Sequence, residues 1–330
     1  MIKSRLALGI MMLFAIVLTA NGQQVDFPRD TSYNLNSAFI KIKKYYPDVT
    51  LVKETSYPSV QEERNVVYYN TGTRDLHADL FYPKKKSHKK IPAVILIHGG
   101  GWASGTKAHM VPLAQKLAEN GYFAAAVEYR LSPEAIYPAG VYDLKSFVKW
   151  LKIHSDEFGI DTTRIATLGA SAGATLASLL GATGQNPVFK SYDFGKKVSD
   201  KVQAIVNIDG VVDFTAPGES AKDEDPAKPS AGARWFGATY KQRPDLWKQA
   251  SALYYAGQKT PPTIFINSTQ PRFHAGRDQY IEILKENGIE YRIFTIPDTP
   301  HTFWLFHPWF EEVYPKVISF LNDTFQYKGN

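Results

Sequence analysis

The 330-residue chain contains no cysteine, which excludes a disulfide framework, a thiolate metal site, a lipid-modified cysteine and a cysteine nucleophile. It also has little net charge, because 38 basic and 32 acidic residues give +6 at pH 7. No arginine-rich groove pattern accompanies this excess, so nucleic acid is not an expected partner. Hydrophobic residues make up 44% and charged residues 21% of the chain, a composition that argues against a disordered protein.

Apolar runs long enough to span a bilayer are missing as well. The run Leu6–Leu18 has 13 residues, whereas a spanning helix needs about 20. Lys3 and Arg5 precede this run and small residues follow it up to Gly22, which is the pattern of a secretory signal peptide. We therefore expect residues 1–22 to be cleaved off, leaving a secreted or periplasmic protein with no membrane span.

Predicted strands and helices alternate over most of the remaining chain. A continuous apolar run predicts a buried strand at 93–97, a second buried strand is predicted at 123–127, and further strands are predicted at 165–168, 204–208, 263–266 and 292–296. Helical spacing of apolar residues predicts helices around 113–120 and at 143–158, 172–180, 278–286 and 309–325. This alternation predicts a mostly parallel sheet with helices on both faces, whose ligands bind outside the carboxyl ends of the strands.

Two segments depart from the alternation. Residues 23–62 are polar and rich in tyrosine, and we interpret them as an N-terminal extension packed on a catalytic domain at 63–328. A predicted hairpin of strands at 65–69 and 76–82 opens that domain. Residues 211–262 are too long for a plain connection and are rich in aromatic side chains. We expect them to form an insertion over the strand ends, as a lid or a substrate wall.

The segment Gly169–Gly173 has the pattern G-x-S-x-G and lies between a predicted strand and a predicted helix. In this context the pattern predicts a tight turn that holds the Ser171 hydroxyl above the sheet. The N-terminus of the following helix favours developing negative charge. Ser171 is therefore the candidate nucleophile, and the plainer alternative is a packing turn of small residues.

Three consecutive glycines follow His98 at the end of the strand 93–97. They leave backbone N–H groups unshielded, so Gly100 and Gly101, together with Ala172, are the predicted oxyanion hole. A flexible glycine loop is the alternative interpretation. We expect His98 to buttress the loop.

The candidate general base is His301, in the loop after the last predicted strand. A base in that loop can reach the hydroxyl of Ser171 from above the sheet. His274, which follows the preceding strand, is the competing histidine.

Several motifs carry a resemblance when taken together and in order. They are His98–Trp102, Tyr129–Glu134, Tyr137–Ala139 with Asp143, and Gly169–Gly173. Over roughly residues 65–325 the chain resembles the α/β-hydrolase carboxylesterases of the hormone-sensitive-lipase-like group. Within that group it looks most like secreted bacterial polysaccharide acetylesterases and feruloyl esterases, of the acetylxylan or pectin acetylesterase type. The resemblance implies hydrolysis of an ester through an acyl-enzyme on Ser171, with no cofactor and no metal.

The acid that completes such a triad stays open. The group usually places it shortly after the penultimate strand, but residues 267–273 contain no carboxylate. Asp209 ends the preceding strand and is the favoured candidate, since the role needs a carboxylate that accepts the second imidazole N–H. Asp278 is the alternative, followed by Asp298 and Asp213. A turn residue at Asp209 and a helix-dipole acid at Asp278 are the plainer interpretations.

Four side chains near these loops are candidate substrate contacts. Arg272 is placed to pair with a uronate carboxylate, although a structural ion pair explains it equally well. Trp102 and Trp304 offer flat faces for sugars or fill the loop cores, and His274 joins them.

The residues and this resemblance together imply a secreted serine carboxylesterase with a Ser-His-Asp triad. Its expected partner is an acylated, above all acetylated, oligo- or polysaccharide. A serine peptidase on the same fold and a non-catalytic carbohydrate-binding protein of this fold are the alternatives. The sequence carries no signal for the oligomeric state.

Overall fold

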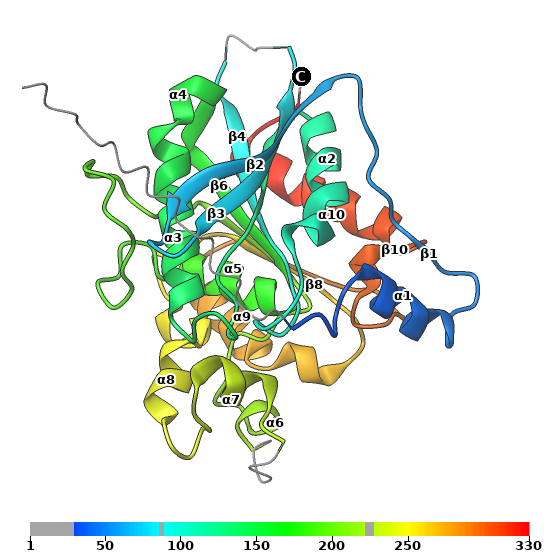
Figure 1. Cartoon of the computed structure of the whole chain (residues 1–330), viewed down its shortest axis with the longest axis vertical. Helices are drawn as coiled ribbons and strands as arrows, with labels where there is room; N and C mark the ends of the chain where they lie inside the picture. The colour runs from blue at the N-terminus through cyan, green and yellow to red at the C-terminus, as the bar shows by residue number, and fades with distance from the viewer. Residues whose placement is uncertain (1–29, 86–88, 222–227, 330) are drawn as a thin grey trace, which may run out of the picture.

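The computed structural model describes residues 30–85, 89–221 and 228–329, and its centre is an eight-stranded sheet (Figure 1). The strand order is β2-β3-β5-β4-β6-β7-β8-β9. The pairs β2–β3 and β3–β5 are antiparallel, and the other pairs are parallel. The mostly parallel sheet predicted from the alternating elements is confirmed.

The strands are β1 Thr50–Leu51, β2 Val60–Asn70, β3 Asp75–Pro83, β4 Ile91–Ile97, β5 Phe123–Val127, β6 Ile160–Ala170, β7 Ala204–Ile208, β8 Thr263–Asn267, β9 Tyr291–Thr295 and β10 Phe306–His307. The α-helices are α1 Leu35–Lys43, α2 Val111–Glu119, α3 Ala139–Ile153, α4 Ser155–Phe158, α5 Ala172–Ala182, α6 Pro217–Ser220, α7 Ala231–Phe236, α8 Pro244–Gln249, α9 Arg277–Glu286 and α10 Phe310–Phe325. Every residue of the central strands β4 and β5 is buried, as their continuous apolar runs require.

Two hydrophobic clusters flank the sheet, one on each face. Helices α3, α5 and α9 contribute Phe147, Leu176 and Tyr280 to the first cluster. Helices α2 and α10, which lie side by side in Figure 1, contribute Leu117 and Phe320 to the second. Because β5, β4 and β6 to β9 run parallel, their carboxyl ends lie along one edge, where α/β sheets bind their ligands.

Some predicted elements have other boundaries in the structure, and two of the differences are instructive. Strand β2 begins at Val60 rather than at residue 65, so part of the predicted extension belongs to the sheet. The single helix predicted at 143–158 is wrong, because the chain forms α3 and α4 with a break at His154. His154 has φ −93° and ψ 9°, which ends the helical geometry, and Gly159 stops α4 in the left-handed region.

The segment before the sheet packs on the second hydrophobic cluster. Helix α1 buries Ala38 and Ile42 there, and β1 pairs antiparallel with β10, with Thr50 opposite His307. The predicted signal peptide, residues 1–22, lies outside the described residues. Within the ranges that the structure describes, no helix combines the length and hydropathy needed to cross a bilayer.

Residues 211–262 carry α6, α7 and α8, which gather beside one another at one end of the molecule (Figure 1). An aromatic cluster joins this insertion to the glycine loop after β4. The rings of Trp102 and Trp235 stack with 4.7 Å between their centroids, and Phe214 contacts both. The insertion therefore supports the loop that was predicted to bind the oxyanion.

Trp235→Ala is expected to lower the free energy of unfolding by about 3–5 kcal/mol, because it removes a buried ring from this cluster and leaves a cavity. Denaturant titration followed by circular dichroism measures the loss. Tyr254→Ala is the matched control, since Tyr254 lies in the same insertion and is 46% exposed. Its expected loss is about 1 kcal/mol or less. Equal losses in the two variants would contradict the structural role of the cluster.

Candidate active site

Ser171 lies in a strained turn between β6 and α5, with φ 54° and ψ −123°. Such backbone strain in a residue other than glycine is typical of functional sites. Neighbouring backbone allows no side chain at the flanking glycines. A Cβ on Gly169 would lie 2.0 Å from the Gly173 oxygen, and one on Gly173 would lie 2.1 Å from the Ile97 oxygen. The two glycines thus permit the close approach that leaves Ser171 at the N-terminus of α5.

His301 and Asp209 meet Ser171 at the carboxyl edge of the sheet. The His301 Nε2 atom lies 2.7 Å from the Ser171 Oγ atom, and its Nδ1 atom lies 2.8 Å from an Asp209 carboxylate oxygen. A carboxylate at Nδ1 fixes the proton there, which leaves Nε2 to accept the hydroxyl proton of Ser171. The three side chains follow β6, β7 and β9 in the chain.

Asp209 is fully buried, and hydrogen bonds from the neighbouring strand end orient its carboxylate. The backbone N–H of Ser268 donates to one oxygen at 2.9 Å, and its hydroxyl donates to the other at 2.8 Å. The side-chain amide of Asn267 adds a longer contact at 3.4 Å. Sequence reasoning missed both residues, although hydrogen-bond donors at the last position of β8 and directly after it are a usable signal.

The other three candidate acids lie away from the imidazole. Asp278 has a side chain 75% exposed and pairs with Arg277. Asp213 accepts hydrogen bonds from Thr215, and Asp298 is exposed on its loop. Of the four candidates, Asp209 is the one that hydrogen-bonds to His301 in the described part of the chain.

Two aromatic rings hold the imidazole of His301 in its plane. Phe273 stacks on it with 3.4 Å between centroids and an angle of 7°. Trp304 meets it edge-on at 5.4 Å and is only 5% exposed. Sequence reasoning missed Phe273. Of the two roles weighed for Trp304, sugar contact and filling of the loop core, the second matches its place among the buried residues of the second cluster.

A small pocket of about 80 Å³ opens above Ser171. Gly101 and Ala172 line it, and no hydrogen bond within the described residues uses their backbone N–H groups. Both N–H groups are therefore available to an oxyanion. Gly100 is not part of the lining, and its carbonyl closes the loop by accepting from the backbone N–H and the hydroxyl of Ser104.

Two of the remaining candidate substrate contacts line the pocket, and the third lies outside its lining. Trp102 and Arg272 line the pocket, and Arg272 also lies 3.5 Å from Glu219 of the insertion. Arg272 thus forms the structural ion pair that was its alternative role, and it also lines the pocket. His274 lies outside the pocket lining, and its Nε2 atom is 2.8 Å from the carbonyl oxygen of Ser268, the residue that orients Asp209.

Burial lowers the pKa of His301 below its ordinary value. The Asp209 carboxylate opposes this shift, and the positive charge of Arg272 adds to it. A lowered pKa keeps the imidazole neutral near pH 7, which is the form that accepts a proton. Among the described residues, no cluster of three or more His, Asp or Glu side chains is arranged to hold a metal ion.

Arg272→Gln is expected to shift the acidic limb of the pH profile of kcat/KM to higher pH. Removing a nearby positive charge favours the imidazolium form, so the pKa of His301 rises and the base is lost at a higher pH. Arg243→Gln is the matched control, since Arg243 forms an exposed ion pair with Asp245 in the insertion. An unchanged or lower acidic limb in Arg272→Gln would contradict the electrostatic coupling.

A mostly parallel sheet whose carboxyl edge carries a serine turn, a histidine and a buried aspartate defines an α/β-hydrolase fold. Residues 78–277 match the BD-FAE family, and the chain belongs to this family. The resemblance to the hormone-sensitive-lipase-like carboxylesterases is thereby confirmed.

Parts of this chain are similar to known proteins. The esterase LipC of Mycobacterium tuberculosis is 27% identical over 195 residues, which cover 58% of this chain and 47% of LipC. A truncated carbohydrate esterase from gut microbiota superposes with a TM-score of 0.69 at 20% identity, covering 82% of this chain and 99% of that chain. An acetyl ester-xyloside bifunctional hydrolase from Caldicellulosiruptor lactoaceticus superposes with a TM-score of 0.65 at 20% identity. The match covers 80% of this chain and 97% of the hydrolase chain. The chain spans less than half of the length of LipC.

Proposed function

We propose that this protein is a serine carboxylesterase that removes short acyl groups, above all acetyl, from oligo- or polysaccharides. The observation that carries the proposal is the unbroken chain of contacts from Asp209 through His301 to Ser171, at 2.8 and 2.7 Å. Nucleophile and base within hydrogen-bond reach, with the base oriented by a third group, are the arrangement required for acyl transfer.

The proposed reaction has two halves. The Ser171 oxygen attacks the ester carbonyl while His301 takes the hydroxyl proton, and the N–H groups of Gly101 and Ala172 bind the oxyanion. His301 then gives the proton to the leaving sugar oxygen, and the C–O ester bond breaks. Water next attacks the acyl-enzyme, again losing its proton to His301, which returns it to Ser171 as the acid leaves.

Preference for a short acyl group rests on the size of the pocket. Its volume of about 80 Å³ is far below the roughly 300–1,000 Å³ of sites for drug-sized ligands. The buried ring of Trp102 and the insertion residues Ala231 and Gly232 close its walls. An acetyl group fits this space, whereas a long chain reaches beyond its walls.

The sugar part of the substrate is inferred from the rim and from the relatives. Arg272, whose side chain is 58% exposed, is the proposed contact of the glycosyl unit at the mouth of the pocket. Two of the structures with the same fold are described as a carbohydrate esterase and an acetyl ester-xyloside hydrolase. The signal-peptide pattern before Gln23 supports export, which would bring the protein to polysaccharides outside the cytoplasm.

Acetic acid release from acetylated xylan, pectin and glucomannan tests the proposal. We expect release from at least one of them, together with a fall in kcat/KM of tenfold or more from p-nitrophenyl acetate to p-nitrophenyl octanoate. No release from any of the three polymers, with activity on p-nitrophenyl esters, would contradict the polysaccharide substrate. Equal rates on acetate and octanoate esters would contradict the short acyl pocket.

A further inference from the structure

A second pocket, of about 340 Å³, lies on the other side of the glycine loop from Ser171. We call it the hairpin pocket, because the β2–β3 hairpin supplies part of its lining. Its lining includes Arg74 and His77 from the hairpin, Lys107 and Ala108 after the glycine loop, and Glu128 and Glu134 after β5. Its volume lies within the range of small-molecule sites.

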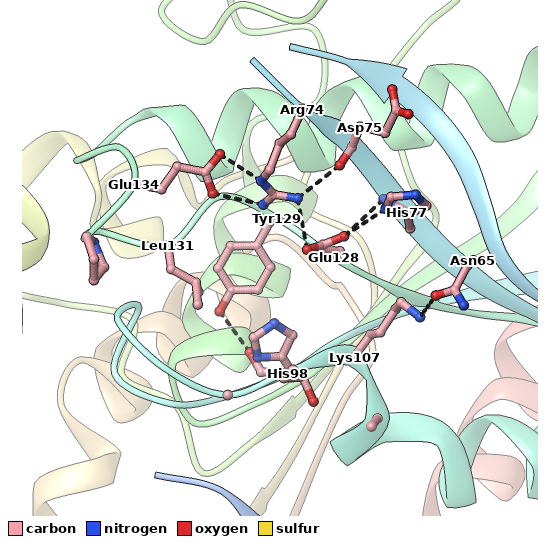
Figure 2. Close-up of a pocket in the computed structure, with 14 residues that line it drawn as sticks. Asn65, Arg74, Asp75, His77, His98, Lys107, Glu128, Tyr129, Leu131 and Glu134 are labelled. Atoms are coloured by element: carbon pink, nitrogen blue, oxygen red, sulfur yellow. Dashed lines mark hydrogen bonds and ion pairs between the residues drawn. The ribbon is translucent and has the colours of Figure 1, made fainter. Parts of the chain in front are cut away.

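The polar groups of the hairpin pocket are held in fixed positions. Glu128 lies between Arg74 and His77, as Figure 2 shows. Arg74 donates two hydrogen bonds to the Glu134 carboxylate, at 2.9 and 2.8 Å, and one to Glu128 at 2.9 Å. The second Glu128 oxygen lies 3.3 Å from the His77 Nδ1 atom. A ligand therefore meets donors and acceptors that need little further ordering, which lowers the cost of binding.

The cationic side chains of this pocket are paired with carboxylates of the protein. Arg74 is paired with two carboxylates and is 8% exposed, and Lys107 pairs with Asp79 at 2.6 Å. The lining contains two cationic side chains and three carboxylates, so an anionic ligand would meet like charge rather than an unpaired cation. The chemistry favours an uncharged ligand with many hydroxyl groups, which can both donate to carboxylates and accept from imidazole and ammonium groups.

The hairpin pocket lies at the same edge of the sheet as Ser171. Glu128 follows the carboxyl end of β5, and Arg74 precedes the antiparallel strand β3 at that edge. Three strand steps separate β6 from β3, or about 14 Å at about 4.8 Å a step. The glycine loop contributes to both pockets, with Gly101 in one and Gly105 in the other.

We propose that the hairpin pocket is a second binding site, which takes an uncharged glycosyl unit. It is distinct from the acyl pocket and does not take part in ester cleavage. Binding of sugar there does not depend on ester hydrolysis at Ser171, so the two proposals can fail separately.

Isothermal titration of the folded Ser171→Ala protein with xylotriose, mannotriose and trigalacturonate tests the site without turnover. We expect at least one neutral trisaccharide to bind and trigalacturonate to bind more weakly. His77→Ala, which removes one polar edge, and Ala108→Trp, which fills the pocket, should each weaken that binding at least tenfold. Thermal melts establish that both variants are folded.

His154→Ala is the matched control, because His154 forms a similar histidine–glutamate pair with Glu157 away from the pocket. It should bind the trisaccharide like the parent. Binding of no neutral trisaccharide, preference for trigalacturonate, or equal affinity in all folded variants would overturn the proposal. Absence of esterase activity in the wild-type protein would overturn the proposed function, but it would not change the outcome of these binding measurements.

Discussion

Ser171→Ala is expected to lower kcat/KM for p-nitrophenyl acetate by about 10⁴- to 10⁶-fold, the range found when a triad nucleophile is removed. The Ser171 hydroxyl is the group that faces the His301 Nε2 atom at 2.7 Å. Without it no acyl-enzyme can form. The slow residual rate comes from the oxyanion hole and from binding alone.

Ser178→Ala is the control for this loss. Ser178 lies on the same helix α5, is fully buried, and accepts a hydrogen bond from Asn207. Its removal tests whether any serine change on this helix disturbs the site, and we expect kcat/KM to stay within a few-fold of the wild type. A Ser171→Ala rate close to that of the wild type would exclude the acyl-enzyme mechanism and would favour a non-catalytic role.

Asp209→Asn is expected to lower kcat by about 10⁴-fold while leaving the fold in place. The amide cannot accept from the Nδ1–H of His301 with the strength of a carboxylate, and the imidazole then favours the wrong tautomer. Asn has nearly the same shape as Asp, so the hydrogen bonds from Ser268 have an acceptor on at least one side. Steady-state kinetics with p-nitrophenyl acetate measure the effect, and thermal melts check the folding.

Asp278→Asn is the matched variant, since Asp278 was the alternative acid and its exposed side chain pairs with Arg277. We expect near-normal turnover from it. The reverse pattern, with turnover kept in Asp209→Asn and lost in Asp278→Asn, would move the acid to the second position. In that case the Asp278 carboxylate would have to move next to His301 when substrate binds.

Much of the fold follows from local pattern. The strands β4 and β5 occur where apolar runs were seen, because a strand covered on both faces needs apolar side chains on each. The predictions failed at the start of β2 and at a break inside a predicted helix. The polar first half of β2 gives no apolar run, because β2 is an edge strand of the sheet. The break at His154 also occurs within a continuous helical pattern.

The site was predictable where its residues are neighbours in sequence. The turn at Ser171 depends on Gly169 and Gly173 within two positions, so its pattern is visible in the chain. The partners of His301 are distant, with Asp209 92 positions away and Ser171 130 positions away. Spacing alone therefore left four carboxylates open for the position beside its imidazole.

The sequence by itself determined the order of strands and helices, the serine turn and the glycine loop, because periodicity and close backbone approach are properties of adjacent residues. The tertiary structure alone decided that Asp209 meets His301, that Phe273 stacks on this imidazole, and that Arg74 joins Glu128 and Glu134 in a second pocket. Each of these contacts forms between segments that only the pairing and twist of the sheet bring to the same edge.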